Sequence, residues 1–316
     1  MKSWVGLKME VAEDMQNAFL RDVLFPSINY YGLCDTVNNY NFIRYFEHYP
    51  QIRLRMEVDE TSIDNDAIIY LLSEQDSRFK FKNIQSGKSI EKQGIDWKFY
   101  QIETDPNLFG NIKGLELARE HHTSSTKTIL NYIREDNIDT IPRNLWQAIL
   151  VEIIQGLSFK LSRDQLLSHF RKLFDLSFHI AFAYKLSNNP ELEAGLRNNC
   201  EQIVHLQILK MKPYLDTILN GDSVIEFVKT KIWVEEWFEF NKKFFISVNN
   251  MILNKSVFVP NPLEKVYNIQ FEQSHEMSIA SFYLTVSHHS FNRLGLTPVQ
   301  ESLVYLSIVR TIESFN

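Results

Sequence analysis

The chain contains few cysteines and no long apolar run. Only two cysteines, Cys34 and Cys200, occur among 316 residues, and they lie far apart. This number excludes a zinc site built from cysteines and fits reduced cytosolic thiols. No stretch reaches the roughly 18 apolar residues that a membrane-spanning helix needs. The opening residues, MKSWVGLKMEVAED, lack the apolar centre of a signal peptide. We therefore expect a cytoplasmic protein without a membrane segment.

An excess of positive charge is also lacking. The 33 Lys and Arg residues are outnumbered by 39 Asp and Glu residues, which gives a formal net charge of -6. Proteins that bind nucleic acids usually present a concentrated basic surface, because contacts with phosphates dominate their affinity. No block of Lys and Arg is long enough to form a basic tail. The charge pattern therefore argues against nucleic acid as a partner.

Several common catalytic signatures are absent as well. The sequence contains no GxGxxG, GxxxxGK[ST], HExxH or GxSxG pattern, which removes the usual nucleotide-binding, zinc-protease and serine-hydrolase interpretations. Hydrophobic residues make up 44% of the chain and charged residues 23%, as in ordinary globular proteins. The 23 Phe and 13 Tyr residues fit an aromatic core. Some of these rings could instead line a large apolar substrate site.

The first hundred residues predict strands. The segment QIRLRMEV at 51–58 alternates apolar and polar residues with period two, which is typical of a strand with one buried face. Its arginines, Arg53 and Arg55, share the polar face. Further strands are expected at 5–11, 41–46, 77–83 and 97–103, with a polar turn at 85–87 and a short helix at 13–24 that Pro26 ends.

The remainder of the chain predicts helices. Apolar residues recur with helical spacing at 114–134, 142–157, 163–186, 191–219, 224–252 and from about 263 into the 280s. Thr297, Pro298 and Gln300 form a capping-box pattern at the start of the last helix. Strands followed by helices indicate an α+β fold. We expect a single unit over 1–316, with a strand-rich layer at 1–110 and a helical layer at 111–316.

Arginines form the first candidate cluster. Arg53 and Arg55 are two residues apart and therefore lie on one side of their strand, and Arg44 is on the preceding strand. Paired guanidiniums could clamp a carboxylate or a peptide carbonyl. The alternative is a solvated sheet face on which Arg53 merely pairs with Glu57.

Histidines form the other two clusters. Ser287-His288-His289-Ser290 precedes Asn292, and on a helix His288 and Asn292 lie one turn apart on the same face. A histidine can accept and return a proton near pH 7, although histidines here could equally cap or fray a helix end. The spacing indicates no third ligand for a metal. The HHTSS segment at 121–125 is more typical of a polar helix face than of a site.

These clusters coincide with motifs of a known family. The stretch NFIRYFEHYPQIRLRMEV at 41–58 resembles the "FFIRY…P…HLRLRF" strand pair of the lantibiotic dehydratase C-terminal domain, also called the thiopeptide-type bacteriocin biosynthesis domain. HHSFNRLGLTPVQESLVYLSIVR at 288–310 resembles that family's "HMxxNRLxG…xxE" ending, and 100–130 resembles its "Y…E…RYGG…E…DS" segment. The resemblance spans nearly the whole chain, and the order and spacing of the motifs carry it.

The resemblance implies chemistry on a ribosomally made precursor peptide, without a metal or an organic cofactor. By position, it assigns catalytic roles to His288 and to Arg53 or Arg55. We expect substrate contacts from four further residues, Arg44, Ser287, Asn292 and Tyr283. The arginine of the family's "RYGG" motif is missing, because 103–111 reads ETDPNLFGN. A carboxylate leaving group would therefore lose one cationic partner, at a cost of roughly 1.5–3 kcal/mol.

Three hypotheses follow. The first is a pyridine synthase, which joins two dehydroalanines by a formal [4+2] aza-cycloaddition and expels water and the leader peptide. The second is the elimination subunit of a split lantibiotic dehydratase, which removes glutamate from glutamylated Ser or Thr. The third is a non-catalytic peptide-binding scaffold. The expected partners are the leader and modified core of the precursor and other enzymes of the same pathway. Long apolar-striped helices are consistent with a homodimer.

Overall fold

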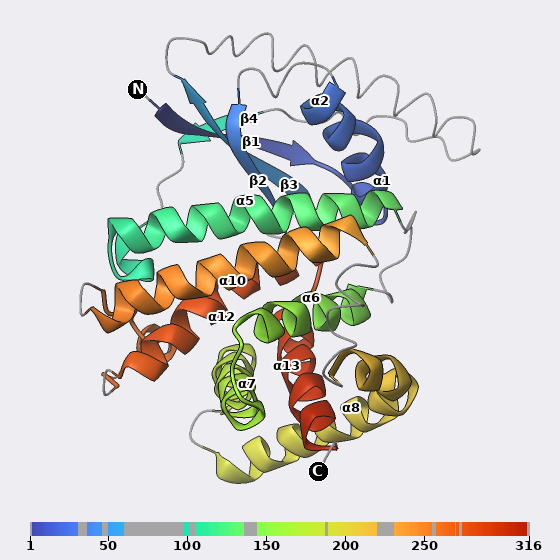
Figure 1. Cartoon of the computed structure of the whole chain (residues 1–316), viewed down its shortest axis with the longest axis vertical. Coiled ribbons are helices and arrows are strands. Elements are labelled where there is room, and N and C mark those ends of the chain that lie inside the picture. Colours follow the sequence, from blue (N-terminus) through green and yellow to red (C-terminus); the bar gives the residue numbers. More distant parts are fainter. Residues whose placement is uncertain are drawn as a thin grey trace. The chain divides into compact units, whose positions relative to one another are not determined.

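The computed structural model describes residues 2–30, 37–45, 50–59, 98–101, 105–135, 144–186, 189–219, 231–254, 257–268, 270–271 and 274–314 (Figure 1). Contacts divide the chain into two compact units. We call Met1–Thr104 with Ser125–Ile141 the sheet unit, and Asp105–Ser124 with Pro142–Asn316 the helical unit. The predicted strand at 77–83 and the turn at 85–87 lie outside the described residues. The α+β fold is confirmed.

The sheet unit contains a four-stranded antiparallel sheet in the order β2-β3-β1-β4. Its strands are β1 (Lys2–Glu10), β2 (Val37–Tyr45), β3 (Gln51–Asp59) and β4 (Lys98–Gln101). The strands predicted at 5–11, 41–46, 51–58 and 97–103 are thus confirmed over the described residues. Strand β1, the first in sequence, lies inside the sheet, so the β2–β3 pair and β4 flank it on opposite sides.

The two faces of β3 differ as the alternation predicts. Ile52, Leu54 and Met56 are fully buried, whereas Arg53 and Arg55 are partly exposed. Register places Leu54 opposite Leu7 of β1 and Phe42 of β2, which are also fully buried. Period-two alternation therefore separates an apolar face from an arginine-bearing face.

The helical segment after β1 continues past Pro26, so the prediction that Pro26 ends it was wrong. A 3-10 turn (Glu13–Met15), α1 (Gln16–Phe19), a π-helical turn (Leu20–Leu24) and α2 (Phe25–Tyr30) follow one another. A proline inside an α-helix removes one N–H donor and its ring clashes with the carbonyl four residues earlier. The π-helical turn immediately before Phe25 changes this spacing and accommodates the ring.

The helical unit is built from long helices at the predicted positions. They are α6 (Asn144–Ser158), α7 (Arg163–Leu186), α8 (Pro190–Leu219), α10 (Ile232–Leu253) and the first half of α5 (Ile112–Glu135). A short 3-10 turn, Pro106–Phe109, precedes α5. Trp237 of α10 is fully buried and donates a hydrogen bond from Nε1 to the backbone oxygen of Val151 in α6, at 3.0 Å. Every helix that the structure describes is too short or too polar to span a lipid bilayer.

The helix predicted from 263 into the 280s is in fact two helices, α11 (Pro262–Tyr267) and α12 (His275–Leu294). Asn268 ends α11 in the left-handed conformation, with a φ of 53°. Asparagine tolerates this conformation better than most residues do. The side chain of Ser274 then begins α12 by accepting a hydrogen bond from the Met277 backbone N–H. Apolar spacing alone did not reveal this interruption, because both helices carry compatible patterns.

A tight turn joins α12 to α13 (Pro298–Glu313). Gly295 ends α12 with a φ of 80°, and its N–H donates to the Asn292 oxygen at 3.0 Å. Thr297 then starts α13, and the predicted capping box with Gln300 is present. In Figure 1, α13 runs past α7 and α8, and it contacts both helices. This local geometry determines where the first turn of α13 meets the last turns of α12.

Replacing Thr297 with alanine tests this cap. The substitution removes the side-chain oxygen that accepts from the Gln300 N–H. We expect the free energy of unfolding to fall by about 1 kcal/mol, the usual effect of losing an N-cap. Urea denaturation followed by circular dichroism measures it. Thr297→Ser keeps the acceptor and is the matched control; an equal loss in both variants would contradict the capping explanation.

Candidate functional site

His288 and Glu301 form a hydrogen-bonded pair in the helical unit. The Nδ1 atom of His288, near the end of α12, lies 2.9 Å from Oε1 and 3.0 Å from Oε2 of Glu301, in the first turn of α13. A carboxylate can only accept, so Nδ1 donates. The His288 side chain is 49% exposed, whereas that of Glu301 is 6% exposed. A buried carboxylate therefore orients a half-exposed imidazole, and Nε2 has no partner within the described part of the chain.

Glu301 also changes the protonation of this ring. Burial by itself lowers the pKa of His288, but the hydrogen bond from Nδ1 to Glu301 and the carboxylate charge outweigh it and raise the pKa above its ordinary value of 6.5. The imidazolium is thus stabilised near neutral pH. A half-exposed imidazolium backed by a carboxylate is suited to donate a proton to a leaving group and to take one back.

Removing the Glu301 charge tests this arrangement. In Glu301→Gln the cause of the raised His288 pKa is gone, so the imidazolium should be lost at a lower pH. If His288 acts as an acid, the falling limb of the kcat–pH profile moves to lower pH, and kcat at neutral pH falls about tenfold. Carbon-13 NMR titration of the His288 ring checks the pKa directly. Glu301→Asp, which keeps the charge, should shift the pKa less; equal shifts would contradict the electrostatic cause.

His288 is the first of four neighbouring histidine rings, and the other three lie progressively closer to the interior of the helical unit. The ring centroids of His288 and His289 are 5.8 Å apart, those of His289 and His122 4.3 Å, and those of His122 and His121 6.3 Å. His121 is fully buried and His122 is 5% exposed. The prediction that this part of 121–125 forms a polar helix face was therefore wrong. Neighbouring helices cover it.

Next to these rings, a buried glutamine connects three helices. Gln155 of α6 accepts a hydrogen bond from His121 Nε2 at 3.0 Å and donates to Ser287 Oγ of α12 at 3.2 Å. A longer contact of 3.4 Å joins the Gln155 amide to Glu152 Oε2. Ser287 is fully buried, and Glu152 and Gln155 are each 1% exposed. The predicted residue Ser287 thus belongs to a polar cluster directly behind His288, and any contact of Ser287 with substrate stays a prediction.

Glu152 is the most strongly perturbed carboxyl of this cluster. Burial raises its pKa to about 8; the nearby Ser287 hydroxyl opposes this shift, and the charge of Glu301 adds to it. Its Oε1 atom has no hydrogen-bond partner among the described residues. Sequence reasoning missed both Glu152 and Glu301. A signal was present for each: Glu152 is the single charged residue in the apolar run AILVEII, and Glu301 is the one glutamate in the stretch 288–310 that resembles the family's ending.

The other predicted residues of the helical unit lie in different surroundings. Tyr283 is fully buried, with ring centroids 4.8 Å from Phe159 and 5.7 Å from His169. Its position in this aromatic core favours a structural role. Asn292 is partly exposed one turn after His288, and its backbone oxygen accepts from Gly295. Substrate binding by Tyr283 and Asn292 stays a prediction.

In the sheet unit, Arg53 and Arg55 share the polar face of β3. The guanidinium of Arg53 lies 3.5 Å above the Tyr45 ring and donates from Nε to Gln51 Oε1 at 3.2 Å. Arg55 Nε is buried and has no hydrogen-bond partner in the part of the chain that the structure describes. Arg55 faces Gly6 of β1, which has no side chain to cover it. That these arginines and His288 line one cavity stays a prediction.

Arg44 does not join this pair. It is opposite Ile52 in the register of β2 and β3, so it lies on the apolar face, away from Arg53 and Arg55. The side chain is buried and donates to Gln16 Oε1 at 3.2 Å and to Asn17. Burial lowers its pKa to about 10, which a nearby Glu13 opposes. These contacts tie the sheet to the helical segment after β1, and a part for Arg44 in substrate binding stays a prediction.

Among the described residues, no group of three or more His, Cys, Asp or Glu side chains is arranged to hold a metal ion. The chemistry that the observed site supports is proton transfer and hydrogen bonding. His288 can exchange a proton with a bound molecule, Glu301 stabilises its charged form, and the cluster around Gln155 fixes the helices that carry both.

Comparisons with known proteins agree with this architecture. The solved structure of TsrL superposes with a TM-score of 0.64 at 14% identity, over 99% of this chain and 95% of that chain. The pyridine synthase TbtD, from thiomuracin biosynthesis, gives 0.60 at 12% identity, over 99% and 98%. The tRNA-dependent lantibiotic dehydratase MibB from Microbispora sp. 107891 gives 0.53 at 14% identity; the match covers 99% of this chain but 28% of that one.

No protein with a curated description matches the chain. The sequence model of the lantibiotic biosynthesis dehydratase C-terminal domain, however, matches residues 4–312. That match covers nearly every residue of both units, including β1, β3, α12 and α13. The chain therefore belongs to the family of the lantibiotic dehydratase C-terminal domain.

Proposed function

We propose that the protein is a pyridine synthase that acts on a ribosomally made precursor peptide. In this reaction a backbone amide of the peptide tautomerises to an imidic acid, which creates an azadiene with one dehydroalanine. The azadiene adds across a second dehydroalanine, and two carbon–carbon bonds close a six-membered ring. The hydroxyl then leaves as water and the leader peptide leaves as its amide, so the ring becomes an aromatic pyridine without an external oxidant.

The observation that carries the proposal is the His288–Glu301 pair. The departing hydroxyl needs a proton, and the half-exposed imidazolium of His288 can supply it from Nε2 while Nδ1 remains bonded to Glu301. The neutral imidazole then accepts the proton that is lost as the ring aromatises. The acid is thus restored within one turnover. In this proposal Arg53 and Arg55 bind peptide carbonyls by charged hydrogen bonds.

The segment before α5 favours this reaction over elimination of glutamate. Residues 105–111, DPNLFGN, contain no Lys or Arg where the family motif has an arginine. Asp105 accepts from the Asn107 N–H at 2.9 Å and starts a 3-10 turn. A Cβ at Gly110 would lie 2.1 Å from Cγ1 of Val257, so the backbone there is tightly packed. In this proposal the segment offers a departing glutamate no Lys or Arg side chain. The hydroxyl and amide that leave in pyridine formation require no such partner.

Reconstitution with two substrates separates the candidate functions. The purified protein is incubated with a linear precursor that carries azoles and two dehydroalanines, and separately with a glutamylated precursor. We expect the first to yield a macrocycle and a released leader amide in mass spectra. Loss of glutamate from the second substrate alone would establish the elimination subunit instead. No conversion of either, with binding of both, would indicate the non-catalytic scaffold and contradict the proposal.

A further inference from the structure

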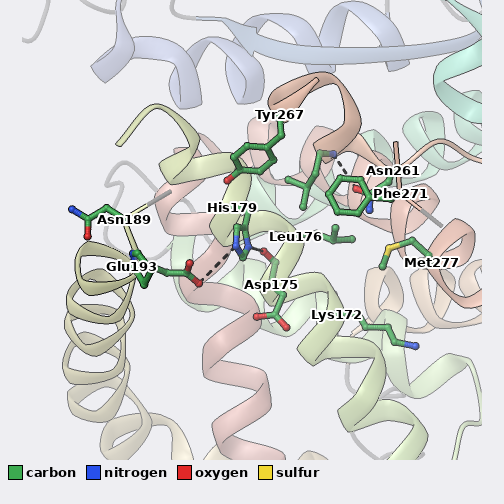
Figure 2. A pocket seen from close by; sticks show the side chains of 12 residues that line it. Lys172, Asp175, Leu176, His179, Asn189, Glu193, Asn261, Tyr267, Phe271 and Met277 are labelled. Atoms are coloured by element: carbon green, nitrogen blue, oxygen red, sulfur yellow. Dashed lines mark hydrogen bonds and ion pairs between the residues drawn. The ribbon is translucent and has the colours of Figure 1, made fainter. Parts of the chain in front are cut away.

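A cavity lies at one end of the helical unit, among α7, the start of α8, α11 and the first turn of α12. Its volume is about 780 Å³, within the range of sites that bind small molecules or short peptide segments. Figure 2 shows the side chains that line it, with His179 and Glu193 on one side and Phe271 and Met277 on the other. His288 and the cluster around Gln155 do not line it.

One wall of the cavity is apolar. Leu176 of α7 and Leu263 of α11 form its buried base, at 4% and 7% exposure. Phe271 and Met277 line the same side and are partly exposed. A flat ring and a flexible thioether adapt to different aliphatic or aromatic groups. This wall therefore suits an apolar side chain of a ligand.

The opposite wall carries two carboxylates that share one guanidinium. Arg197 of α8 donates from Nη1 to Asp175 Oδ1 and from Nε to Glu193 Oε1, both at 2.9 Å. The Arg197 guanidinium also lies 4.4 Å from the centroid of the Phe178 ring, which restricts its movement. One cation between two carboxylates leaves one negative charge. Both carboxylates line the cavity, so this charge is available to a ligand.

The remaining charged and titratable groups do not cancel this negative charge. Lys172 lines the cavity but is paired with Glu276, whose side chain is 78% exposed and does not line the cavity. His179 Nδ1 lies 2.8 Å from the Asp175 backbone oxygen, and because that oxygen can only accept, Nδ1 donates. Nε2 lies 3.7 Å from Glu193 Oε1, so a protonated ring forms an ion pair with that carboxylate, whereas a neutral ring leaves Nε2 as a further acceptor. This wall is therefore rich in acceptors and suits an ammonium group.

We propose that this cavity binds a segment of the substrate peptide in which an apolar side chain adjoins an ammonium group. The apolar side chain packs on Leu176, Phe271 and Met277, and the ammonium bonds to Asp175 and Glu193. The ammonium belongs either to a lysine or to a free peptide N-terminus. The inference rests on the proposed function, because it treats the ligand as part of the precursor peptide.

The position of the cavity along α12 separates this segment from the reacting residue. Met277 and His288 are both in α12, which spans His275–Leu294. Their separation corresponds to about 16 Å along the helix axis and about three full turns, so both project from the same side. An extended peptide needs about five residues to span this distance. The cavity would therefore bind a part of the peptide that is about five residues away from the part next to His288.

Fluorescence anisotropy with synthetic peptides tests the inference without any turnover. The probe is a labelled, N-acetylated nine-residue peptide with a Phe-Leu-Lys centre and Gly/Ser flanks. A second peptide has norleucine in place of lysine, and a third has no lysine but a free N-terminus before Phe-Leu. We expect the lysine probe to bind about tenfold more tightly than the norleucine peptide, with the difference reduced at high salt. The third peptide shows which source of ammonium is preferred.

Two variants locate the binding. Glu193→Gln keeps the shape of the wall but removes its excess charge, and should lower the affinity for the lysine probe about tenfold without affecting the norleucine peptide. Met277→Trp narrows the apolar wall and should weaken both. Glu239→Gln on α10, an exposed glutamate paired with Lys242, is the control. Equal affinity for the lysine and norleucine peptides, no binding of either, or binding that neither variant alters would overturn the inference. Precursor conversion is measured separately, so a failure of this inference can be told apart from a failure of the proposed function.

Discussion

Replacing His288 with alanine is expected to lower kcat for precursor conversion by about 10²- to 10⁴-fold, the usual contribution of a positioned acid–base group. The substitution removes the half-exposed ring that Glu301 holds through Nδ1. It also leaves the buried Glu301 carboxylate without its cationic partner. Mass spectrometry of the precursor mixture under single-turnover conditions measures the rate of the chemical steps.

Two comparisons make this result specific. His205→Ala on α8 removes an exposed histidine and should leave kcat unchanged. Binding of the unreacted precursor to His288→Ala should change little, because the ring is assigned to proton transfer and not to affinity. A variant that converts substrate at the normal rate would remove His288 from the mechanism. Circular dichroism of His288→Ala shows whether this variant is folded. If it is not, His288→Gln, which keeps most of the side-chain volume, tests the loss of the imidazole in its place.

Replacing Glu152 with glutamine is expected to stabilise the protein at alkaline pH, although it removes a buried carboxyl from the polar cluster. Burial raises the pKa of Glu152 from 4.5 to about 8. In the folded protein the group therefore keeps its proton up to about pH 8, whereas in the unfolded chain it ionises near pH 4.5. The folded state binds more protons across this interval, so Glu152 reduces stability progressively as the pH rises from about 4.5 to about 8.

The size of this change in stability follows from the difference between the pKa of Glu152 in the unfolded chain, 4.5, and in the folded protein, about 8. Glutamine does not ionise, so Glu152→Gln should gain about 2–4 kcal/mol relative to the natural chain at pH 8, and little at pH 4.5. Urea denaturation at pH 4.5, 6 and 8 measures the difference. Glu235→Gln, at an exposed position of α10, should show no such trend. A Glu152→Gln variant that is less stable than the natural chain at every pH would mean that the carboxylate, and not the acid, is the bonded form.

Local patterns in the sequence predicted most of the secondary structure. Strand β3 was predictable because period-two alternation matches the pleat of a strand, and α7 because its apolar spacing runs without interruption from Arg163 to Leu186. The capping box at Thr297 was predictable because all of its groups lie within one turn. The two wrong predictions of helix boundaries also have local causes. A π-helical turn accommodates Pro26, and Asn268 divides a helix through a backbone conformation that apolar spacing does not reveal.

The candidate site was predictable only in part. His288 was recognisable from its motif, and the arginines of β3 from their alternation, since both signals are contained in short segments. Glu301 was not predicted as a site residue. Its hydrogen bond with His288 depends on the turn at Gly295, which brings the first turn of α13 next to the end of α12. Glu152 and His121 come from separate helices, and only the packing of those helices brings them to Ser287.

The sequence by itself determined the α+β order of elements, the buried face of β3 and the cap of the last helix, because each depends on residues within a few positions of one another. The tertiary structure alone decided that Arg44 faces away from Arg53 and Arg55, since strand register sets the side of the sheet. It also decided which carboxyl orients His288 and which carboxyl is kept protonated. Those properties arise from distances and burial between helices, and the local patterns around Glu152 and Glu301 do not give either of them.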